Sequence, residues 1–335
     1  MTKPDANPQI LLKARPAGRP GPEHFELVET AIPSPGRGEV LLRHRFLSLD
    51  PYMRGRMDDT HSYAAPVALG GVMEGECVAE VLESQHDGFA PGDWVRGARG
   101  WQGFSAAHGS SLVKIPKDGG GVSHSAYLGV LGMPGTTAWV GITEIGRPKP
   151  GDVFVVSAAS GAVGGVAGQI AKKMGCRVIG IAGGAEKCRY VKEELGFDDC
   201  LDHRGDLPAA LDAACPDGID VYFENVGGPV QEAVFPRMRA FGRIAFCGSV
   251  ATYNTRPLPP GPNLSIMTRR KLTLQGFIVS DHPLAWPVWR ERGAAWLKEG
   301  TLKFKEDVVE GLANAPSAFV GLLEGKNFGK LVIKI

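Results

Sequence analysis

The chain has 335 residues, enough for about two domains, and its 43% hydrophobic and 22% charged residues are typical of a soluble globular protein. Its 37 Lys and Arg residues balance 36 Asp and Glu residues, and a net charge of +1 argues against a nucleic-acid or membrane-surface footprint. No apolar run approaches the ~20 residues of a membrane span, and the first residues lack a signal-peptide pattern. We therefore expect a cytoplasmic protein that binds neither nucleic acid nor membrane.

The first 120 residues contain short β-type runs separated by turns rich in Gly and Pro, without helical periodicity. This pattern predicts a mostly-β domain with few helices. The strands that we expect in it lie at 39–50, 74–84, 92–97 and 111–116.

From residue 151 the chain alternates strands and helices, which predicts a parallel sheet with right-handed crossovers. The tail then returns to strand, helix and strand, and we expect its last strand, 331–335, to pair with the N-terminal β domain. The predicted domains are therefore 1–122 together with 301–335, and 123–300 inserted between them. The strands expected in the inserted domain lie at 152–158, 177–183, 200–203, 219–228, 242–249 and 271–280, with helices at 185–195, 207–214, 231–238 and 287–299.

A strand, a turn of small residues and a helix follow one another after residue 152. The turn has the pattern A-x-G-x-x-G, in which Ala159 stands where the first glycine of a dinucleotide-binding turn usually stands. A helix N-terminus offers unpaired N–H groups to a pyrophosphate, and missing side chains let the phosphate approach the backbone. A merely structural turn is equally compatible with this pattern. The residues expected at the pyrophosphate are Ala159, Gly161, Ala162, Val163 and Gly164.

Separated segments, in the same order along the chain, resemble the zinc-independent medium-chain dehydrogenase/reductases. The branch that they resemble is that of leukotriene 12-hydroxydehydrogenase and prostaglandin reductase, with plant double-bond reductases and bacterial curcumin reductase. The resemblance implies an α/β protein with a Rossmann doubly wound parallel sheet inserted into a GroES-like mostly-β domain, an active site in the cleft and a homodimer. The segments are Leu47–Met57, Leu131–Gly141, Ala158–Gly164, Phe223–Gly228, Gly242–Asn254, Pro257–Asn263 and Asn327–Lys330.

Zinc-dependent relatives in the same superfamily place a ligand cysteine in the region that corresponds to Leu47–Tyr52, and a Gly-His-Glu at Gly71–Met73. Neither region of this chain supplies such ligands. Because catalytic zinc needs three converging side-chain ligands, we expect metal-free chemistry. The six cysteines are scattered, and we expect reduced thiols that are mostly buried.

The second strand of the nucleotide domain ends in Gly183 and Gly184, where an NAD-specific site usually has Asp or Glu. This uncharged end leaves room for a 2′-phosphate, with Lys187 and Arg204 as its cations, and the resemblance points to the same lysine. His203 stands where the family usually has a tyrosine near the phosphate, and its role stays open. We therefore expect NADPH, against the alternative that these residues are solvated surface charges.

Hydride transfer to the β-carbon of an α,β-unsaturated carbonyl compound leaves negative charge on the carbonyl oxygen, which a hydrogen-bond donor stabilises. A neutral phenol suits this task. Tyr253 follows the fifth strand of the nucleotide domain, and Tyr52 belongs to the β domain. The resemblance implies that Tyr253 is the proton donor at the substrate and that Tyr52 lines the pocket. The alternative for each ring is an aromatic packed in the cleft wall, and water is an alternative proton donor to the α-carbon.

Further positions are expected in the cofactor shell because they follow strands of the nucleotide domain or match family positions. They are Thr137, Asn225, Cys247, Phe277, Val279 and Asn327. The function expected from the whole is an NADPH-dependent reductase of the C=C bond of α,β-unsaturated ketones and aldehydes. An NADPH:quinone oxidoreductase and an NADPH-binding protein without turnover remain the alternatives.

Overall fold

The computed structural model describes residues 6–60 and 62–335, which fold into two compact units. The β unit comprises Met1–Leu128 and Glu306–Ile335, and the nucleotide unit is Gly129–Lys305. The boundaries expected after residues 122 and 300 lie a few residues before those of these units. The predicted architecture, a doubly wound parallel sheet inserted into a mostly-β domain, is confirmed by the strand order of the two large sheets.

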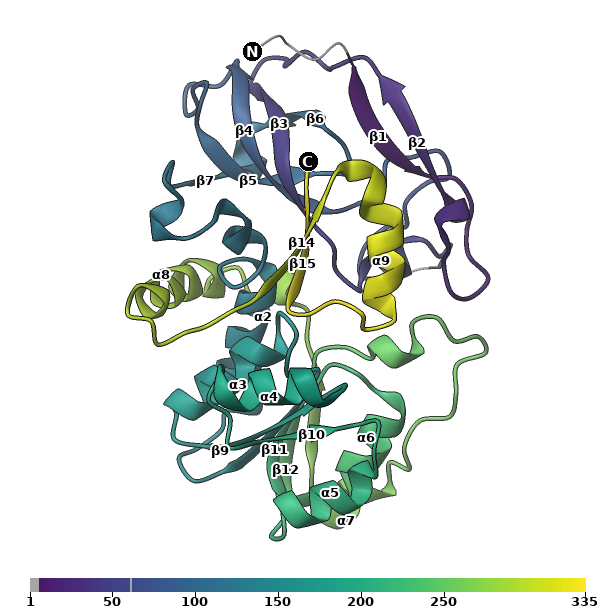
Figure 1. Ribbon diagram of the computed structural model, residues 1–335, viewed down its shortest axis with the longest axis vertical. Coiled ribbons are helices and arrows are strands. Elements are labelled where there is room, and N and C mark those ends of the chain that lie inside the picture. Colours follow the sequence, from purple (N-terminus) through teal and green to yellow (C-terminus); the bar gives the residue numbers. More distant parts are fainter. Residues whose placement is uncertain (1–5, 61) are drawn as a thin grey trace. The chain divides into compact units, whose positions relative to one another are not determined.

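The β unit contains a seven-stranded sheet in which neighbouring strands follow the order β14-β15-β3-β4-β5-β7, with β6 also paired to β3 (Figure 1). The final strand pairs antiparallel with β3, Val332 opposite Ser48, which confirms the predicted return of the tail. These strands are β3 (Glu39–Ser48), β4 (Glu76–Ser84), β5 (Trp94–Arg99), β6 (Phe104–His108), β7 (Val113–Ile115), β14 (Glu306–Glu310) and β15 (Lys330–Lys334).

The sequence reasoning missed β6 and a separate antiparallel hairpin of β1 (Asn7–Leu12) and β2 (Phe25–Thr30). The first strand of the hairpin contains Pro8, and four of the six residues of the second are exposed, so neither shows a clean period-two pattern. The helices of this unit are short: α1 is Met53–Arg56 and α9 is Ala315–Leu323.

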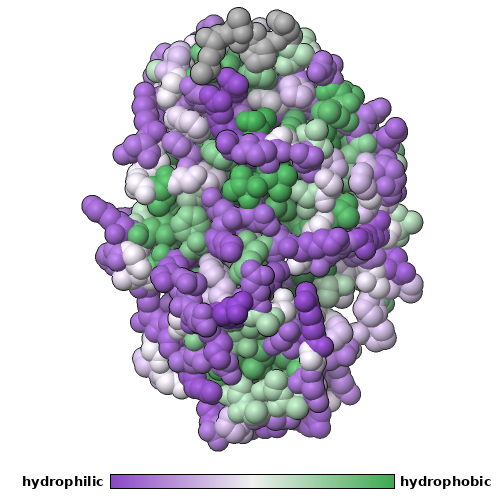
Figure 2. Space-filling model, in the orientation of Figure 1, coloured by the Kyte–Doolittle hydropathy of each residue, from purple (hydrophilic) through white to green (hydrophobic). Residues whose placement is uncertain are grey.

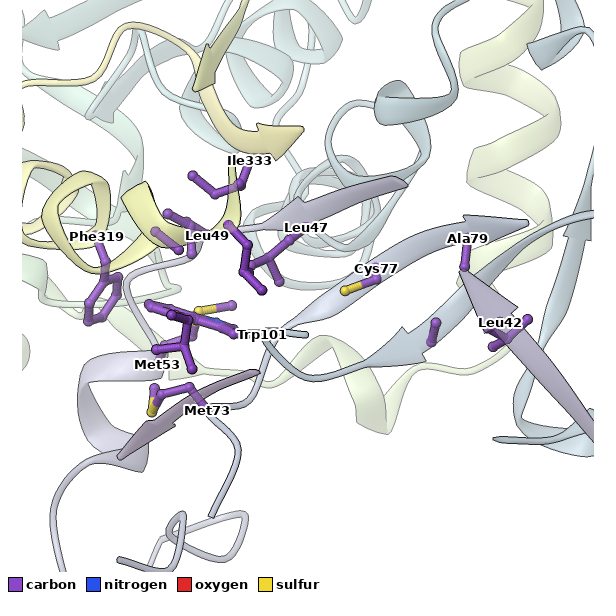
Figure 3. Close-up of a cluster of buried hydrophobic side chains, with 14 of the residues drawn as sticks. Leu42, Leu47, Leu49, Met53, Met73, Cys77, Ala79, Trp101, Phe319 and Ile333 are labelled. Atoms are coloured by element: carbon purple, nitrogen blue, oxygen red, sulfur yellow. The ribbon is translucent and has the colours of Figure 1, made fainter. Parts of the chain in front are cut away.

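The core of the β unit is built around the indole of Trp101, which is fully buried (Figure 3). The ring stacks on Phe25 at 5.5 Å between centroids and meets Phe319 of α9 edge-on at 5.6 Å. Aliphatic side chains of β3 and β15 and the buried thiol of Cys77 complete the cluster. The C-terminal helix is therefore an integral part of the N-terminal domain's core.

The nucleotide unit has a six-stranded parallel sheet in the order β10-β9-β8-β11-β12-β13. The chain order reverses between β8 and β11, and ligands bind at such a switch point in open α/β sheets. The strands are β8 (Val153–Ser157), β9 (Arg177–Ala182), β10 (Asp199–Asp202), β11 (Ile219–Glu224), β12 (Met238–Phe246) and β13 (Thr273–Gly276). The α-helices are α2 (Met133–Val140), α3 (Gly164–Lys173), α4 (Ala185–Glu193), α5 (Leu207–Ala214), α6 (Gly228–Val234), α7 (Ser265–Arg270) and α8 (Ala285–Lys298).

Three of the four helices with predicted bounds in this unit differ from them, α4 and α8 by one or two residues and α6 by more. The helix expected at 231–238 is α6, which begins at Gly228 with Pro229 in its first turn and ends at Val234. Proline has no N–H group and a fixed φ, so it suits the first turn of a helix. A short 3₁₀ turn follows, and Met238 already belongs to β12.

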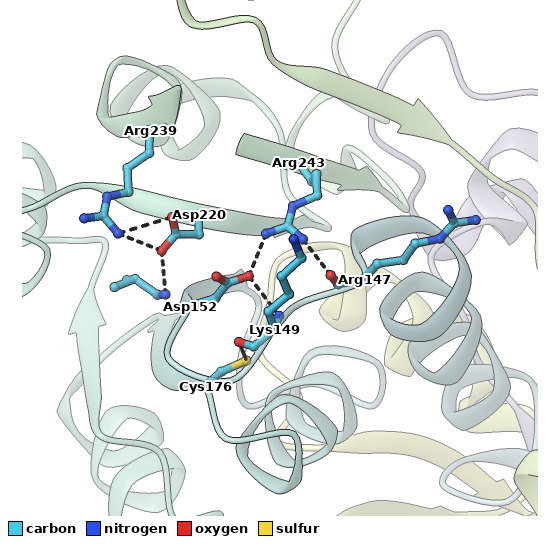
Figure 4. Close-up of polar contacts among 8 residues, drawn as sticks. Arg147, Lys149, Asp152, Cys176, Asp220, Arg239 and Arg243 are labelled. Atoms are coloured by element: carbon cyan, nitrogen blue, oxygen red, sulfur yellow. Dashed lines mark hydrogen bonds and ion pairs between the residues drawn. The ribbon is translucent and has the colours of Figure 1, made fainter. Parts of the chain in front are cut away.

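Charged side chains pair at the amino ends of β8, β11 and β12 (Figure 4). Asp152 lies 2.6 Å from the Arg243 guanidinium, and Asp220 lies 3.1 Å from that of Arg239. The Asp220 carboxylate also accepts a hydrogen bond from the N–H of Val153 at 2.9 Å. We call these four charged residues the amino-end cluster.

Polar and apolar residues are interspersed over the face shown in Figure 2. Within residues 6–60 and 62–335, no helix has both the length and the apolar character that crossing a bilayer requires. Several large apolar side chains of the nucleotide unit are exposed between residues 258 and 288: Leu258, Leu264, Leu274, Leu284 and Val288.

Candidate active site

The turn between β8 and α3 leaves little room for side chains at the two glycines that the sequence singled out. A Cβ atom placed on Gly164 would lie 2.4 Å from the carbonyl oxygen of Ala158, and one on Gly161 would lie 3.1 Å from the same oxygen. Ala158 itself has a positive φ of 52°, so the turn is tight. Ala162 and Val163 lie between the glycines, immediately before α3. The exposed backbone and the N–H groups of the helix start fit a pyrophosphate.

Ala159 replaces the usual first glycine because its methyl group has a place in the core. The residue is fully buried, and its N–H donates to the carbonyl oxygen of Ile181 at 3.0 Å. A Cβ atom on Gly180 in β9 would lie only 2.8 Å from the Ala159 methyl group. The missing side chain in β9 thus makes room for the extra methyl group in the turn, and the departure from the glycine pattern is a matter of packing.

The side chains of His203 and Arg204 lie against the uncharged end of β9. A Cβ atom on Gly183 would lie 2.8 Å from His203 Nε2, and one on Gly184 would lie 2.9 Å from Arg204 Nη1. Lys187 is half-buried in the first turn of α4, the helix that begins at this point. The expected cations therefore lie on the two segments next to the glycines: Lys187 at the start of α4 and Arg204 after β10.

The sequence reasoning missed Asp202, which shapes this place. Its carboxylate accepts hydrogen bonds from the N–H groups of Gly184 at 2.9 Å and Arg204 at 3.0 Å. These two bonds lower the pKa of Asp202. An acidic residue at the end of a short strand, directly before two basic residues, was the signal available in the sequence.

The switch point between β8 and β11 is closed by Asn225. Its side-chain amide donates to the carbonyl oxygen of Ser157 at 2.8 Å, and its N–H donates to the Ser157 hydroxyl at 2.8 Å. The completely buried Glu224, also missed, accepts hydrogen bonds from that hydroxyl and from the N–H groups of Val226 and Gly227 at 2.7–3.0 Å. Burial raises the pKa of Glu224. A charged residue ending a buried strand could have revealed it.

Tyr253 lies at the carboxyl end of β12. The backbone carbonyl of Glu224 accepts the N–H groups of Cys247 and Gly248 at 2.9 and 3.1 Å, which ties this strand end to β11. A Cβ atom on Gly248 would lie 3.0 Å from the phenolic oxygen of Tyr253. The hydroxyl of the predicted donor thus lies against a glycine where the parallel strands end.

Phe277 and Val279 follow β13, and the Phe277 ring packs against the π-helical segment Gly141–Gly146. The Phe277 ring meets Phe223 edge-on at 6.3 Å, and a Cβ atom on Gly141 would clash with both rings. Three residues after Val279, His282 Nδ1 lies 2.6 Å from a carboxylate oxygen of Glu144 in that segment. The predicted backbone contacts at this strand end therefore belong to a well-fixed segment.

Thr137 lies on α2 and is nearly buried. Its hydroxyl donates to the carbonyl oxygen of Met133, one turn earlier, at 2.8 Å. The hydroxyl therefore has an intrahelical partner.

Tyr52 and Asn327 belong to the β unit, on segments that are joined by Lys330. The buried Lys330 ammonium lies 3.2 Å from Asp50, two residues before Tyr52, and donates to the carbonyl oxygen of Leu49 at 2.7 Å. Asn327, three residues before this lysine, donates to the Gly329 carbonyl oxygen at 2.8 Å. The lysine was also missed as a contributor to the site, although it ends the NFGK segment.

Burial raises the pKa of the Tyr52 phenol, and the neighbouring carboxylates of Asp50 and Glu74 raise it further. The ring packs on the core of the β unit, and the Arg56 guanidinium lies 5.7 Å from its centroid. A phenol in these surroundings stays neutral at ordinary pH and keeps its proton available for a hydrogen bond.

No three or more His, Cys, Asp or Glu side chains gather as a metal site within the part of the chain that the structure describes. The expectation of metal-free chemistry stays a prediction.

Residues 8–115 match a family model described as "N-terminal domain of oxidoreductase", and residues 162–298 match one described as "Zinc-binding dehydrogenase". The chain is 49% identical to "NADPH-dependent curcumin reductase" of Escherichia coli (strain K12), over 98% of this chain and 97% of the relative. It is 40% identical to "2-alkenal reductase (NADP(+)-dependent)" of Nicotiana tabacum, over 100% and 99% of the two chains.

Among solved structures, the chain is similar to CurA of Vibrio vulnificus in complex with NADPH. The TM-score is 0.93 and the identity 47%, with 98% of each chain covered. Identity at this level over the full length shows common family membership as well as a common fold. The chain therefore belongs to the medium-chain dehydrogenase/reductase superfamily, in the branch of the curcumin, alkenal and prostaglandin reductases.

Proposed function

We propose that the protein is an NADPH-dependent reductase of the C=C bond of α,β-unsaturated ketones and aldehydes. The observation that carries the cofactor choice is the end of β9, where two glycines lie under the side chains of His203 and Arg204. The names of two relatives, NADPH-dependent curcumin reductase and NADP(+)-dependent 2-alkenal reductase, support the reaction class.

The residues present fit NADPH. The turn of Gly161 and Gly164 would hold the pyrophosphate, and Lys187, His203 and Arg204 would hold the 2′-phosphate. NADPH, when bound, supplies the hydride for the β-carbon of the substrate. The residues proposed for the rest of the cofactor are Thr137, Ala159, Ala162, Val163, Gly183, Asn225, Cys247, Tyr253, Phe277, Val279 and Asn327.

The chain's own contribution to the chemistry is to orient the acceptor and stabilise charge on its carbonyl oxygen. The Tyr253 hydroxyl donates a hydrogen bond to that oxygen, and the bond strengthens as negative charge develops there. Tyr52 lines the substrate pocket as a neutral phenol, since its surroundings raise its pKa. The reaction is complete when the α-carbon takes a proton, from Tyr253 or from water.

Incubation with NADPH and a panel of alkenals, enones and quinones, followed by product analysis, tests the proposal. A saturated ketone or aldehyde with its carbonyl intact is the expected product. An allylic alcohol or a hydroquinone as the main product would assign a different reaction. Tight NADPH binding without oxidation by any acceptor would indicate a binding protein without turnover.

Substitution of each tyrosine by phenylalanine tests its assigned role. We expect Tyr253→Phe to lower kcat about 100-fold, the usual effect of a lost hydrogen-bond donor to a developing oxyanion. Tyr52→Phe should act mainly on the KM for the acceptor. Equal kcat values for wild type and Tyr253→Phe would remove Tyr253 from the mechanism.

Lys187→Ala tests the assignment of the 2′-phosphate. The substitution should raise the KM for NADPH much more than the KM for NADH, because NADH lacks the 2′-phosphate. A parallel rise for both cofactors would show that Lys187 does not contact the 2′-phosphate.

The protein is proposed to be a homodimer that pairs through β13. All four residues of this edge strand are exposed, and its only strand neighbour in the described chain is β12. A two-fold axis lets identical edge strands pair antiparallel, which would satisfy their N–H and C=O groups. Sedimentation of wild type and of Leu274→Arg tests this, with a shift to monomer expected for the variant.

A further inference from the structure

The imidazole of His203 is fixed at the glycine end of β9. Its backbone N–H donates to the carbonyl oxygen of Ala182 at 3.1 Å, so the end of β10 is tied to the end of β9. Its Nε2 atom lies 2.8 Å from the point where Gly183 would carry a Cβ atom. The side chain of His203 is exposed.

Charged groups of both signs lie on the two segments that meet here, and Asp202 interacts electrostatically with His203. On its own segment, Asp202 accepts the N–H groups of Gly184 and Arg204, and Asp206 accepts the N–H of Ala209 at the start of α5. Arg204 adds a positive charge beside the ring. The first turn of α4 contributes one charge of each sign, Glu186 and Lys187. Both acidic groups of the β10–α5 segment are thus engaged with the backbone.

We infer that His203 makes the preference for NADPH over NADH depend on pH: its imidazolium form binds the 2′-phosphate and its neutral form does not. The inference rests on the proposed NADPH site. Histidine is the side chain whose charge ordinarily changes between pH 5 and 8. Lys187 and Arg204 stay charged throughout this range and supply the part of the selectivity that does not change.

Thermodynamic linkage determines the direction in which pH changes the affinity for NADPH. Protonation of His203 and binding of the phosphate favour each other, so NADPH binding takes up a proton at this site. The additional affinity is present at low pH and disappears as the pH rises and the imidazole becomes neutral. NADH presents a hydroxyl group at the same position and has no such dependence.

The test is the Kd of NADPH and of NADH, measured without an acceptor by fluorescence or calorimetric titration at pH 6.0 and 8.5. Wild type is compared with His203→Gln, and with His108→Gln as a control for loss of an exposed histidine of the β unit. The NADPH phosphate also changes its charge near pH 6, but this contribution is common to all variants. The difference between wild type and His203→Gln therefore isolates the imidazole.

The preference for NADPH, expressed as the ratio of the two Kd values, should fall about two- to fivefold more in wild type than in His203→Gln between pH 6.0 and 8.5. The His108→Gln variant should follow wild type. Calorimetry in buffers of different ionisation enthalpy should show extra proton uptake with NADPH only when His203 is present. The same pH course in wild type and His203→Gln would overturn the inference, as would equal affinity for both cofactors. Because no acceptor is present, failure of the proposed reductase activity would be seen separately.

Discussion

The two ends of the parallel sheet in the nucleotide unit use charge differently. At the amino ends, side chains pair with side chains, as in Asp152 with Arg243 and Asp220 with Arg239. At the carboxyl ends, the carboxylates of Glu224 and Asp202 each accept two backbone N–H groups, whereas Asp152 and Asp220 each accept one beside their arginine. Acidic residues thus brace the sheet at one end and fix the shape of turns at the other.

The two arrangements have different energetic weight. An ion pair with partly exposed partners contributes about 0–1 kcal/mol, because water screens it and the side chains lose freedom. A buried N–H group that loses its acceptor costs about 1–3 kcal/mol. Substitutions at the carboxyl ends should therefore affect both stability and cofactor binding, whereas those in the amino-end cluster should affect stability alone.

The largest effect is expected at Gly164. In Gly164→Ala the added methyl group would lie 2.4 Å from a backbone oxygen, so the turn must open. Strain of this kind costs about 1–3 kcal/mol, and we expect the Kd for NADPH to rise about 10- to 100-fold. Titration of the purified variant with NADPH measures the change.

Gly161→Ala is the matched control for this change, since its methyl group would meet the same oxygen at 3.1 Å. A shift of a few tenths of an ångström accommodates it, and the loss of affinity should be clearly smaller. Equal losses in the two variants would show that contact with the cofactor, rather than strain in the turn, limits side chains here.

The next effect is expected at Glu224. Glu224→Ala leaves two N–H groups and the Ser157 hydroxyl without their acceptor, and the free energy of unfolding should fall by about 2–4 kcal/mol. Glu224→Gln keeps a carbonyl oxygen for these donors and should cost less than about 1 kcal/mol. Denaturant unfolding measures both. A loss in Glu224→Gln as large as in Glu224→Ala would show that the ionised carboxylate is required.

The alternation of strands and helices was sufficient to predict the sheet of this unit, because buried parallel strands are continuous apolar runs. The last strand was predicted to pair with the N-terminal domain, as it does with β3, whereas its parallel pairing with β14 was not predicted. The hairpin of β1 and β2 was missed because half-exposed strands with irregular alternation lack that signal. The start of α6 at Gly228 was also not predicted. A Gly-Pro pair is compatible both with a turn before a helix and with the first turn of the helix itself.

The site was predictable where a residue type is required by the backbone. Gly161, Gly164 and Gly183 are such positions, because a Cβ atom at each would lie about as close as or closer than atoms normally approach. Glu224 and Lys330 were not found, because a charge in an apolar run has meaning only once its partners across the fold are known. Those partners, such as the Leu49 carbonyl group 281 residues from Lys330, are tertiary contacts.

A smaller effect is expected from the amino-end cluster. Asp152→Ala removes the partner of Arg243 and the acceptor for the N–H of Lys149, and should lower the free energy of unfolding by about 1 kcal/mol. Because the change lies at the opposite end of the strands, the Kd for NADPH should stay within about twofold of wild type. Chemical denaturation and NADPH titration of the same preparation test both statements. A large rise in Kd would show that the two ends are coupled through β8.

The smallest effect is expected at Asp202, where the pKa shift gives it a pH dependence. Hydrogen bonds from Gly184 and Arg204 lower the pKa of this carboxyl in the folded protein, so its stabilisation is present above the unfolded-state pKa and lost as the pH falls through the folded-state value. Asp202→Asn keeps an acceptor oxygen but no charge. Wild type should therefore be more stable than the variant at pH 7, by less than about 1 kcal/mol since the group is well solvated, and the difference should be smaller at pH 3. Unfolding of both proteins at the two pH values measures it. An undiminished difference at pH 3 would mean that the shape of the carboxylate, rather than its charge, makes Asp202 a better acceptor than asparagine. The charge of Asp202 would then contribute little to stability, as is expected for Glu224.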